Sequence, residues 1–481
     1  MRRIRSEFWL YSGFAVSTSL AAISVSSPAA AAPSDIETRR SLVVTEQPIL
    51  ARFPFQRVLD QLVTQSGVQN LTSLSLFHQW WDTQNPGGGP CDSEPPIGPG
   101  VNSYPYQCRP AASQQEGAEA NSDPFIDAGT NPGEYIPIGL FNRFDLAPAN
   151  GANCGEHRIV YARRSGLASI FTRNLIIFEA TMPNPHLEQG LKGCDKIVKF
   201  WANLSKEDDI EVRAEELEEF YFAGLANLPP VVEISHYGDN PTGVGQIRTN
   251  QFLQSGVAVR AWNLREFKLL RTCEGGSCLN MQILPVTDKS NPFGPLFSPS
   301  GTHPRKPDFE TAFLGQVEAL AAGTLAGIDM KIDDPFNSGQ SLAVVGGETD
   351  YVAQFAGPST FRDQLDHAAE AYALVADDII KRARALSCAG CHQLSANSLP
   401  GQDAPDTNLG NDLFWPPSLG FTHVTERDTE LDANGVTRFM ISPALIDVFL
   451  PARKQVMDNF LDDKPFNTRR PDDPIGGRRV H

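Results

Sequence analysis

Before residue 345, the order of hydrophobic and polar positions indicates both strands and helices. Two stretches, 55–66 and 71–85, carry apolar residues at the spacing of amphipathic helices. Alternating or short apolar runs bounded by turn residues predict strands at 135–141, 157–163, 174–182, 230–238, 245–253, 261–272 and 279–287. Further helices are predicted at 206–227 and at about 308–322. Because helices and strands fall in segregated runs, residues 40–345 are predicted to form an α+β region.

The pattern changes beyond a connection at 343–360 that contains Gly, Pro and Ser. The next stretch, 361–387, has apolar residues at steps of three and four, which define one face of a long helix. Another helix is predicted at 442–461. We therefore expect a mostly α-helical part at 355–465, followed by a flexible polar tail at 466–481.

The N-terminus has the pattern of an export signal. Arg2, Arg3 and Arg5 form a basic start, an apolar stretch follows, and Ala29–Ala31 fit a cleavage site. The apolar stretch is short for a membrane span and contains Ser and Thr, so we expect cleavage of residues 1–31 rather than anchoring. No later segment has the apolar length of a membrane span. The mature protein is therefore expected to be exported, most simply to the periplasm.

Charge limits the choice of partners. The 481 residues carry a formal net charge of −17, and loss of the predicted signal, with three Arg and one Glu, leaves about −19. Nucleic-acid binding needs a basic face, so this balance argues against it. It suits a basic partner protein, although a general role in solubility explains the charge equally well.

Eight cysteines in an exported chain favour disulfides. Two of them belong to the motif discussed below, and the order of the other six favours pairing of neighbours. The predicted pairs are Cys91–Cys108, Cys154–Cys194 and Cys273–Cys278. The last pair has the best support, because "TCEGGSC" predicts a tight Gly-Gly turn with its two sides joined.

The segment "SCAGCH" carries the most specific chemistry of the chain. Cys388 and Cys391 are three residues apart, and His392 follows directly. On a helix-like backbone, thiols at this spacing project from one side of a turn. That placement suits attachment to two vinyl groups of one porphyrin, with the adjoining imidazole below the iron. C-x-x-C-H is the signature of covalent haem attachment, and export agrees with it, because this attachment generally occurs outside the bacterial inner membrane.

Three other interpretations fit these residues less well. A thioredoxin-like pair has its first Cys at the start of a helix, whereas the pattern puts Cys388 at the end of a long one. A zinc site needs a second ligand pair, and the sequence offers only His423. A disulfide between Cys388 and Cys391 would close a small loop and leave His392 unexplained. A haem-free thiol or zinc site stays open as an alternative.

With these residues, the stretch 355–465 resembles a c-type cytochrome domain. The similarity lies in the pentapeptide that ends at His392, the helix before it and the helix after the loop. The resemblance implies one haem c, thioether bonds to Cys388 and Cys391, and His392 as the proximal iron ligand. Two other segments, "FNRFDLAPANGANCGEHRIVYARR" and "GFTHV", look like segments of uncharacterised exported bacterial proteins that also carry C-x-x-C-H.

Two side chains are candidates for the sixth iron ligand. Met440 follows His392 by 48 residues and precedes the last helix, which resembles the order of motif, loop, Met and helix in small cytochromes. His423 lies on the loop "PPSLGFTHV", which Pro and Gly tether. Ligation by two histidines usually gives a lower potential than ligation by His and Met. An open sixth position would permit peroxide or other small-ligand chemistry.

The sequence therefore predicts an exported c-type cytochrome that transfers electrons through one haem to or from a redox partner protein, with a basic partner as the electrostatic complement. The front region then docks the partner or adds a reaction of its own. One alternative is a haem-dependent oxidoreductase that handles peroxide or a small substrate. The other is a haem-free binding protein with a thiol or zinc site. The chain lacks the common hydrolase, zincin and nucleotide-binding motifs.

Overall fold

The computed structural model describes residues 36–82, 97–99, 101–107, 122–239, 243–254, 260–397 and 407–464. Three sequence predictions lie outside the described residues: the export signal at 1–31, the tail at 466–481 and the Cys91–Cys108 pair. Within the described residues, no helix has the length and apolar character of a membrane-spanning segment.

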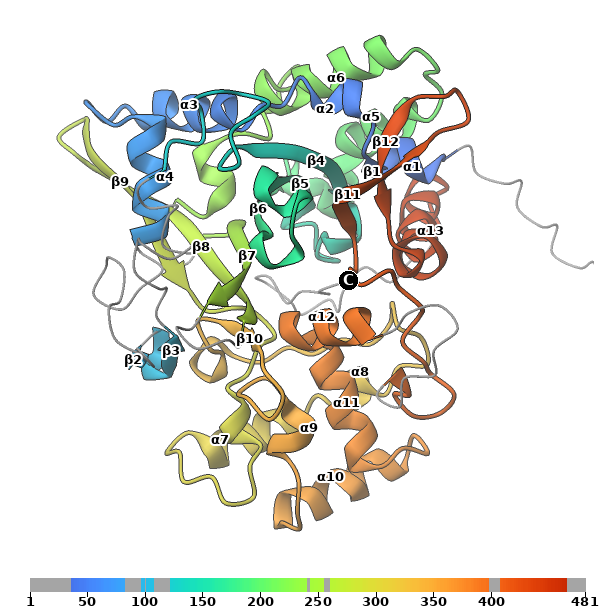
Figure 1. Ribbon diagram of the computed structural model, residues 1–481. Helices are drawn as coiled ribbons and strands as arrows, with labels where there is room; N and C mark the ends of the chain where they lie inside the picture. The colour runs from blue at the N-terminus through green and yellow to red at the C-terminus, as the bar shows by residue number, and fades with distance from the viewer. Residues whose placement is uncertain are drawn as a thin grey trace, which may run out of the picture. The chain divides into compact units, whose positions relative to one another are not determined.

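An antiparallel sheet is the central element of the described chain (Figure 1). Its order is β1-β4-β5-β6-β7-β8-β10, and β9 also pairs with β8. The strands are β1 (Val43–Val44), β4 (Tyr135–Arg143), β5 (Asn153–Arg163), β6 (Asn174–Pro183), β7 (Gln246–Gln254), β8 (Arg260–Glu274), β9 (Ser277–Val286) and β10 (Ser341–Ala343). Two small hairpins are β2 (Ile97–Pro99) with β3 (Pro105–Gln107), and β11 (Val424–Leu431) with β12 (Thr437–Ile441). The predicted mixed α+β class is confirmed, with a large antiparallel sheet.

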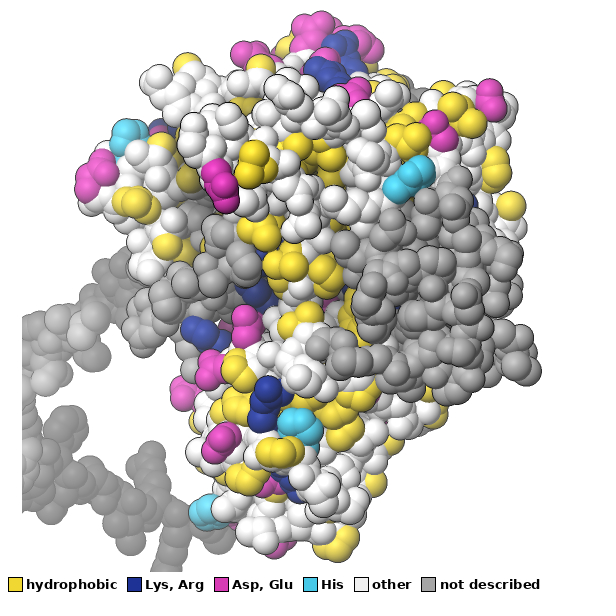
Figure 2. Space-filling view, turned by 90° about the vertical axis from the view of Figure 1, so that its left-hand side faces the viewer, with side chains coloured by type: hydrophobic (Ala, Val, Ile, Leu, Met, Phe, Trp, Pro, Cys, Tyr) yellow, Lys and Arg dark blue, Asp and Glu magenta, His cyan; other side chains and the backbone are white. Residues whose placement is uncertain are grey.

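Helices surround this sheet. They are α1 (Thr38–Ser41), α2 (Gln47–Leu50), α3 (Phe55–Ser66), α4 (Ser73–Asp82), α5 (Asp195–Leu204), α6 (Ile210–Phe222), α7 (Lys306–Leu314), α8 (Val317–Leu320), α9 (Tyr351–Gln354), α10 (Thr360–Glu370), α11 (Ala376–Leu386), α12 (Cys388–Asn397) and α13 (Leu450–Leu461). In Figure 1, α12 lies between the sheet and the group formed by α7 to α11. The outer face of α6 is acidic, and its Glu211 and Glu218 form ion pairs with Arg52. Figure 2 shows acidic and basic side chains gathered at the top of the view.

The predicted strand at 230–238 is wrong. Its residues form a turn of 3-10 helix at Ile234–Tyr237 instead. The amides of Val231 and Val232 donate to carbonyl oxygens at the end of α6, 3.2 and 2.9 Å away, and so do not pair with a strand. Tertiary hydrogen bonding therefore overrides the local β propensity of this apolar segment.

The C-terminal part is partly helical, and it differs from the prediction in one split helix and one hairpin that was not predicted. The long helix predicted at 361–387 is split into α10 and α11, because Ala373 adopts a left-handed conformation with φ of 55° and ends the first helix. The sequence pattern also missed the β11–β12 hairpin, which separates the motif from the last helix. Short polar strands of this kind carry little periodic signal.

A single apolar core joins the front region to the C-terminal part. Phe178 of β6 and Leu59 of α3 belong to the same cluster of buried side chains as Leu386 of α11 and Phe460 of α13. Strand β10 extends this contact, because it pairs with β8 and packs against α12. The stretch that carries the cysteine motif is thus held against the sheet.

Two of the predicted disulfides are present. Cys154–Cys194 joins β5 to the residue before α5, and Cys273–Cys278 joins β8 to β9 at their hairpin turn. Disulfides persist mainly in oxidising compartments, so both agree with an exported protein.

Loss of the Cys154–Cys194 bridge should destabilise the fold more than loss of the hairpin bridge. Replacing Cys154 and Cys194 by alanine is expected to lower the free energy of unfolding by about 4 kcal/mol, because the bridge closes a separation of 40 residues. The same change at Cys273 and Cys278, with a separation of 5, is expected to cost about 2 kcal/mol. Urea unfolding of both double variants measures this order, and equal losses would contradict it.

Candidate functional site

The cysteine motif starts a helix. Cys388 is the first residue of α12, and Ser387 caps it: the Gly390 amide donates to Ser387 Oγ at 3.1 Å, and the Cys391 amide donates to the Ser387 carbonyl at 2.9 Å. The Ala389 amide donates to a serine hydroxyl of β10 at 2.9 Å. These bonds satisfy amides that a helix start otherwise leaves without partners. The expectation that Cys388 ends a long helix is therefore wrong.

Gly390 allows α12 to follow directly on α11. A Cβ atom at this position would lie 2.0 Å from the carbonyl oxygen of Arg384, far inside contact distance. A side chain would therefore push the motif away from the end of α11.

Gly390→Ala is expected to lower the free energy of unfolding by about 3 kcal/mol through this backbone clash. Gly323→Ala is a matched control, because a Cβ there meets no atom within 4 Å and its φ is not left-handed. The control should be neutral or slightly stabilising. Thermal unfolding of both variants tests the prediction, and a neutral Gly390→Ala would refute it.

Both thiols and His392 open into one pocket between α12 and the sheet. Its empty volume is about 1100 Å³, a figure that includes open solvent at the mouth. The floor is one face of β4 to β8, where apolar side chains such as Val160, Ile177 and Leu264 alternate with residues that are buried in the core on the other face of the sheet.

The β8 side of the pocket is apolar and holds the imidazole in place. Trp262 stacks on His392, with ring centroids 4.4 Å apart and an angle of 5° between the rings. Trp262 and Leu264 form a small apolar cluster with Cys388 and Ala389. The β8 strand thus fixes the position of the motif from the side opposite α11.

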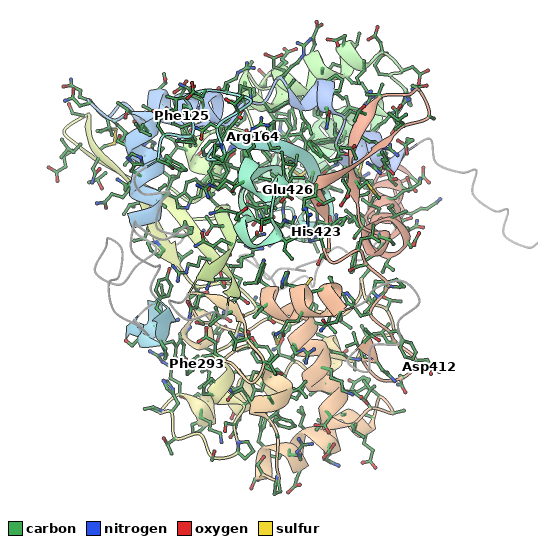
Figure 3. All side chains as sticks on the ribbon, viewed as in Figure 1. Phe125, Arg164, Phe293, Asp412, His423 and Glu426 are labelled. Carbon is green, nitrogen blue, oxygen red and sulfur yellow. A yellow bond between two sulfur atoms is a disulfide. The ribbon has the colours of Figure 1, made fainter. Side chains whose placement is uncertain are left out.

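A loop from the C-terminal part brings His423 to the same pocket. Thr422 Oγ1 lies 3.4 Å from Cys391 Sγ and 2.7 Å from Ser395 Oγ of α12. The backbone of His423 is held as well, because the Ser442 amide donates to its carbonyl at 2.9 Å. Figure 3 shows His423 above α12, next to the start of β11. His423 therefore lines the pocket together with the two thiols and His392.

Met440, the other candidate for the sixth ligand, lies on β12 and is not among the residues that line the pocket. Its neighbours Phe439 and Ile441 are buried, whereas Met440 itself is half-buried. The other predicted site residues all line the pocket: Cys388, Cys391, His392 and His423.

Burial keeps the motif uncharged. It raises the pKa of the Cys388 thiol well above its usual range, against the opposing charge of Arg248, and raises the pKa of Cys391 to about 12. Burial also lowers the pKa of His392 to about 3, with a smaller contribution from Arg173. A neutral imidazole is the form that binds a metal, whereas a redox-active thiol needs a lowered pKa.

A ladder of buried ion pairs crosses the floor of the pocket. Arg158 contacts Glu156 at 2.6 Å and Glu179 at 3.1 Å, and Arg248 contacts Glu179 at 3.4 Å and Glu266 at 3.1 Å. These contacts pair each of the two guanidinium groups with two carboxylates. Such pairing is what makes buried charges tolerable.

Arg453 of α13 also lines the pocket but differs from these arginines. It is 4% exposed, and neither a hydrogen bond nor an ion pair joins it to any residue in the described ranges. Its Nε and Nη2 atoms are buried without a hydrogen-bond partner there. Burial, and next the charge of Arg143, lowers the pKa of Arg453 well below its usual range.

The sequence pattern did not identify Trp262 or Arg453. Both lie in elements that were predicted, one in a strand and one in the last helix, but no spacing marks them as neighbours of a motif more than 60 residues away. In the described part of the chain, no three or more His, Cys, Asp or Glu side chains are grouped so that they could hold a metal ion.

The chain was compared with protein-family models, with curated proteins and with solved structures, and none of them matches it.

Proposed function

We propose that the protein is an exported c-type cytochrome that transfers electrons through one haem attached to Cys388 and Cys391. The observation that carries the proposal is the pocket itself. Both thiols, the adjoining His392 and a second imidazole, His423, line one pocket between α12 and the sheet. This arrangement extends the C-x-x-C-H signature from a sequence match to a set of converging side chains.

The residues present fit a haem. Two thiols sit on the first turn of one helix, as two thioether bonds to one porphyrin edge require. The pocket floor presents the apolar side chains of Trp262 and Leu264 on β8 beside Cys388, and the guanidinium groups of Arg143 and Arg158 on β4 and β5. Arg248 of β7, between them, is paired with Glu179 and Glu266. A haem is likewise apolar at its vinyl edge and anionic at its propionate edge. When bound, it supplies a one-electron couple between ferric and ferrous iron.

The chain's own residues would hold and protect that couple. His392 would be the proximal ligand, and its neutral form and the stacked Trp262 prepare the ring for that role. His423 is favoured over Met440 as the sixth ligand, because it alone of the two lines the pocket. The burial of Cys388 and Cys391, each 5% exposed, would limit the access of water to a group attached there, which is one of the factors that set a haem potential.

The interpretation of Cys388 and Cys391 as a redox-active thiol pair is supported by their place in the chain but not by their pKa values. Cys388 does start a helix, which is where such thiols are found. However, both thiols are buried and their pKa values are raised rather than lowered, so the thiolate is disfavoured. A zinc site would need further protein ligands around the motif. Haem attachment therefore remains the better explanation of the motif.

The test is a pyridine haemochrome spectrum of denatured protein purified from the periplasm of a host that matures c-type cytochromes. Covalent haem should survive extraction with acidified acetone, at one haem per chain. The variant Cys388→Ser/Cys391→Ser is the matched control and should lose all haem in the same extraction. A wild-type chain without retained haem would overturn the proposal.

The partner is expected to be a redox protein with a basic docking surface, given the formal charge of −17. A haem-dependent oxidoreductase that handles peroxide or a small substrate is the competing function. It requires a sixth position that is open to ligands, and therefore a His423 that does not bind the iron.

A further inference from the structure

Arg453 of α13 lies at the end of the pocket that is close to β4 and β5. The charges that act most strongly on Arg453 are those of Arg143, Asp145 and Arg158, on β4, the turn after it, and β5. Those that act on Cys388 include Arg248 and Glu266, on β7 and β8. The two groups of charges lie on different strands of the sheet floor, and Glu179 of β6 joins them, because it contacts Arg158 at 3.1 Å and Arg248 at 3.4 Å. With strands about 4.8 Å apart, β5 and β8 are separated by about 14 Å.

Within the described residues, nothing neutralises Arg453. The carboxylate that attracts it, Asp145, already receives two hydrogen bonds from Arg143, at 2.9 and 3.0 Å. A buried guanidinium with unpaired nitrogens is costly unless an anion joins it. Arginine also has the fork of donors that matches a carboxylate.

We propose that Arg453 forms a carboxylate-binding subsite at the β4–β5 side of the pocket, and that it receives a propionate of the porphyrin. The identity of the carboxylate rests on the proposed function: if a haem is joined to the thiols beside β8, Arg453 would be the residue that holds a propionate on the β4–β5 side. The subsite itself rests only on the buried, unpaired guanidinium and the pocket that it lines.

The experiment uses the full chain with Cys388→Ser/Cys391→Ser, which cannot form thioethers, after circular dichroism has verified its fold. The probes are metal-free protoporphyrin IX and its dimethyl ester, which differ only in their carboxylates. We expect the free acid to bind about tenfold more tightly than the ester, the worth of one charge-assisted hydrogen bond. Adding Arg453→Gln should bring the ratio of affinities close to one.

Two further variants sharpen the result. Arg453→Lys keeps the charge without the fork and should retain part of the preference. Lys454→Gln removes the neighbouring cation on α13, which pairs with Asp458 at 3.0 Å and does not line the pocket, and should retain all of it. Equal binding of acid and ester, or an unchanged ratio in Arg453→Gln, would overturn the proposal. So would binding of succinate that depends on Arg453 while the two porphyrins bind alike, because the carboxylate would then come from a small free acid.

A measurement on the holoprotein covers the case in which the serine variant does not fold. Arg453→Gln removes a positive charge near the porphyrin, so the ratio of reduced to oxidised protein at a fixed potential should fall at least threefold. A propionate without its guanidinium should also titrate near neutral pH and make the potential vary with pH. A potential and pH profile equal to those of the wild type would refute the assignment. A chain that retains no haem refutes the proposed function, yet a preference for the free acid would still support the subsite.

Discussion

If the protein carries the proposed haem, His423→Ala is expected to convert its ferric form from a six-coordinate low-spin spectrum to a high-spin one. The physical reason is the position of His423: it lines the pocket with His392 and both thiols, and the Ser442 amide fixes its backbone. Removal of the imidazole leaves only water or a weak donor for the sixth position. The ferric absorption spectrum and electron paramagnetic resonance measure the change.

Met440→Leu is the matched control for this prediction. Met440 lies on β12 and does not line the pocket, so its replacement should leave the low-spin spectrum intact. Addition of imidazole to His423→Ala should restore the low-spin state if the fold is preserved. The prediction fails if Met440→Leu produces the high-spin state, or if wild-type protein is already high-spin and reacts with peroxide. The second result would favour the oxidoreductase.

Acid is expected to destabilise the fold through a pair of buried histidines far from the motif. His157 and His236 are 0% and 3% exposed, and the Trp201 indole donates to His157 Nδ1 at 3.1 Å. Burial, and next the charge of His236, lowers the pKa of His157 to about 3, against the opposing charge of Glu156. Burial also lowers the pKa of His236 to about 4.

The sign of the effect follows from proton binding. Both histidines have a lower pKa in the folded chain than the usual 6.5, so the unfolded chain binds more protons below that pH. Stability is therefore full above about pH 6.5 and is lost as the pH falls toward the folded pKa values. A pH of 4.5 lies about two units below the unfolded pKa of each histidine, so the two histidines together lower the free energy of unfolding by about 5 kcal/mol at that pH.

The measurement is urea unfolding between pH 7 and pH 4.5. His236→Gln should reduce the loss of stability over this range by about half, whatever its effect at pH 7. His367→Gln is the control, since the side chain of His367 is 89% exposed, and it should not change the slope. An unaltered slope in His236→Gln would contradict the prediction.

Periodicity gave good predictions where one face of an element meets the core. The segments at 135–141, 157–163 and 174–182 became β4, β5 and β6, because strands buried on nearly their whole length appear in the sequence as short apolar runs bounded by turn residues. Periodicity failed at 230–238 and at 361–387. In the first case amides bond to the end of α6, and in the second a single left-handed residue, Ala373, interrupts an otherwise continuous apolar face.

The sequence by itself determined three features: two thiols and an imidazole at fixed spacing, the Cys273–Cys278 turn, and the α+β class. These depend on neighbours along the chain, so local spacing is sufficient to identify them. Only the tertiary structure decided that His423 rather than Met440 joins the pocket, and that Arg453 enters it from α13. Those contacts join residues far apart in the sequence, and strand pairing and core packing, which no local pattern encodes, bring them together.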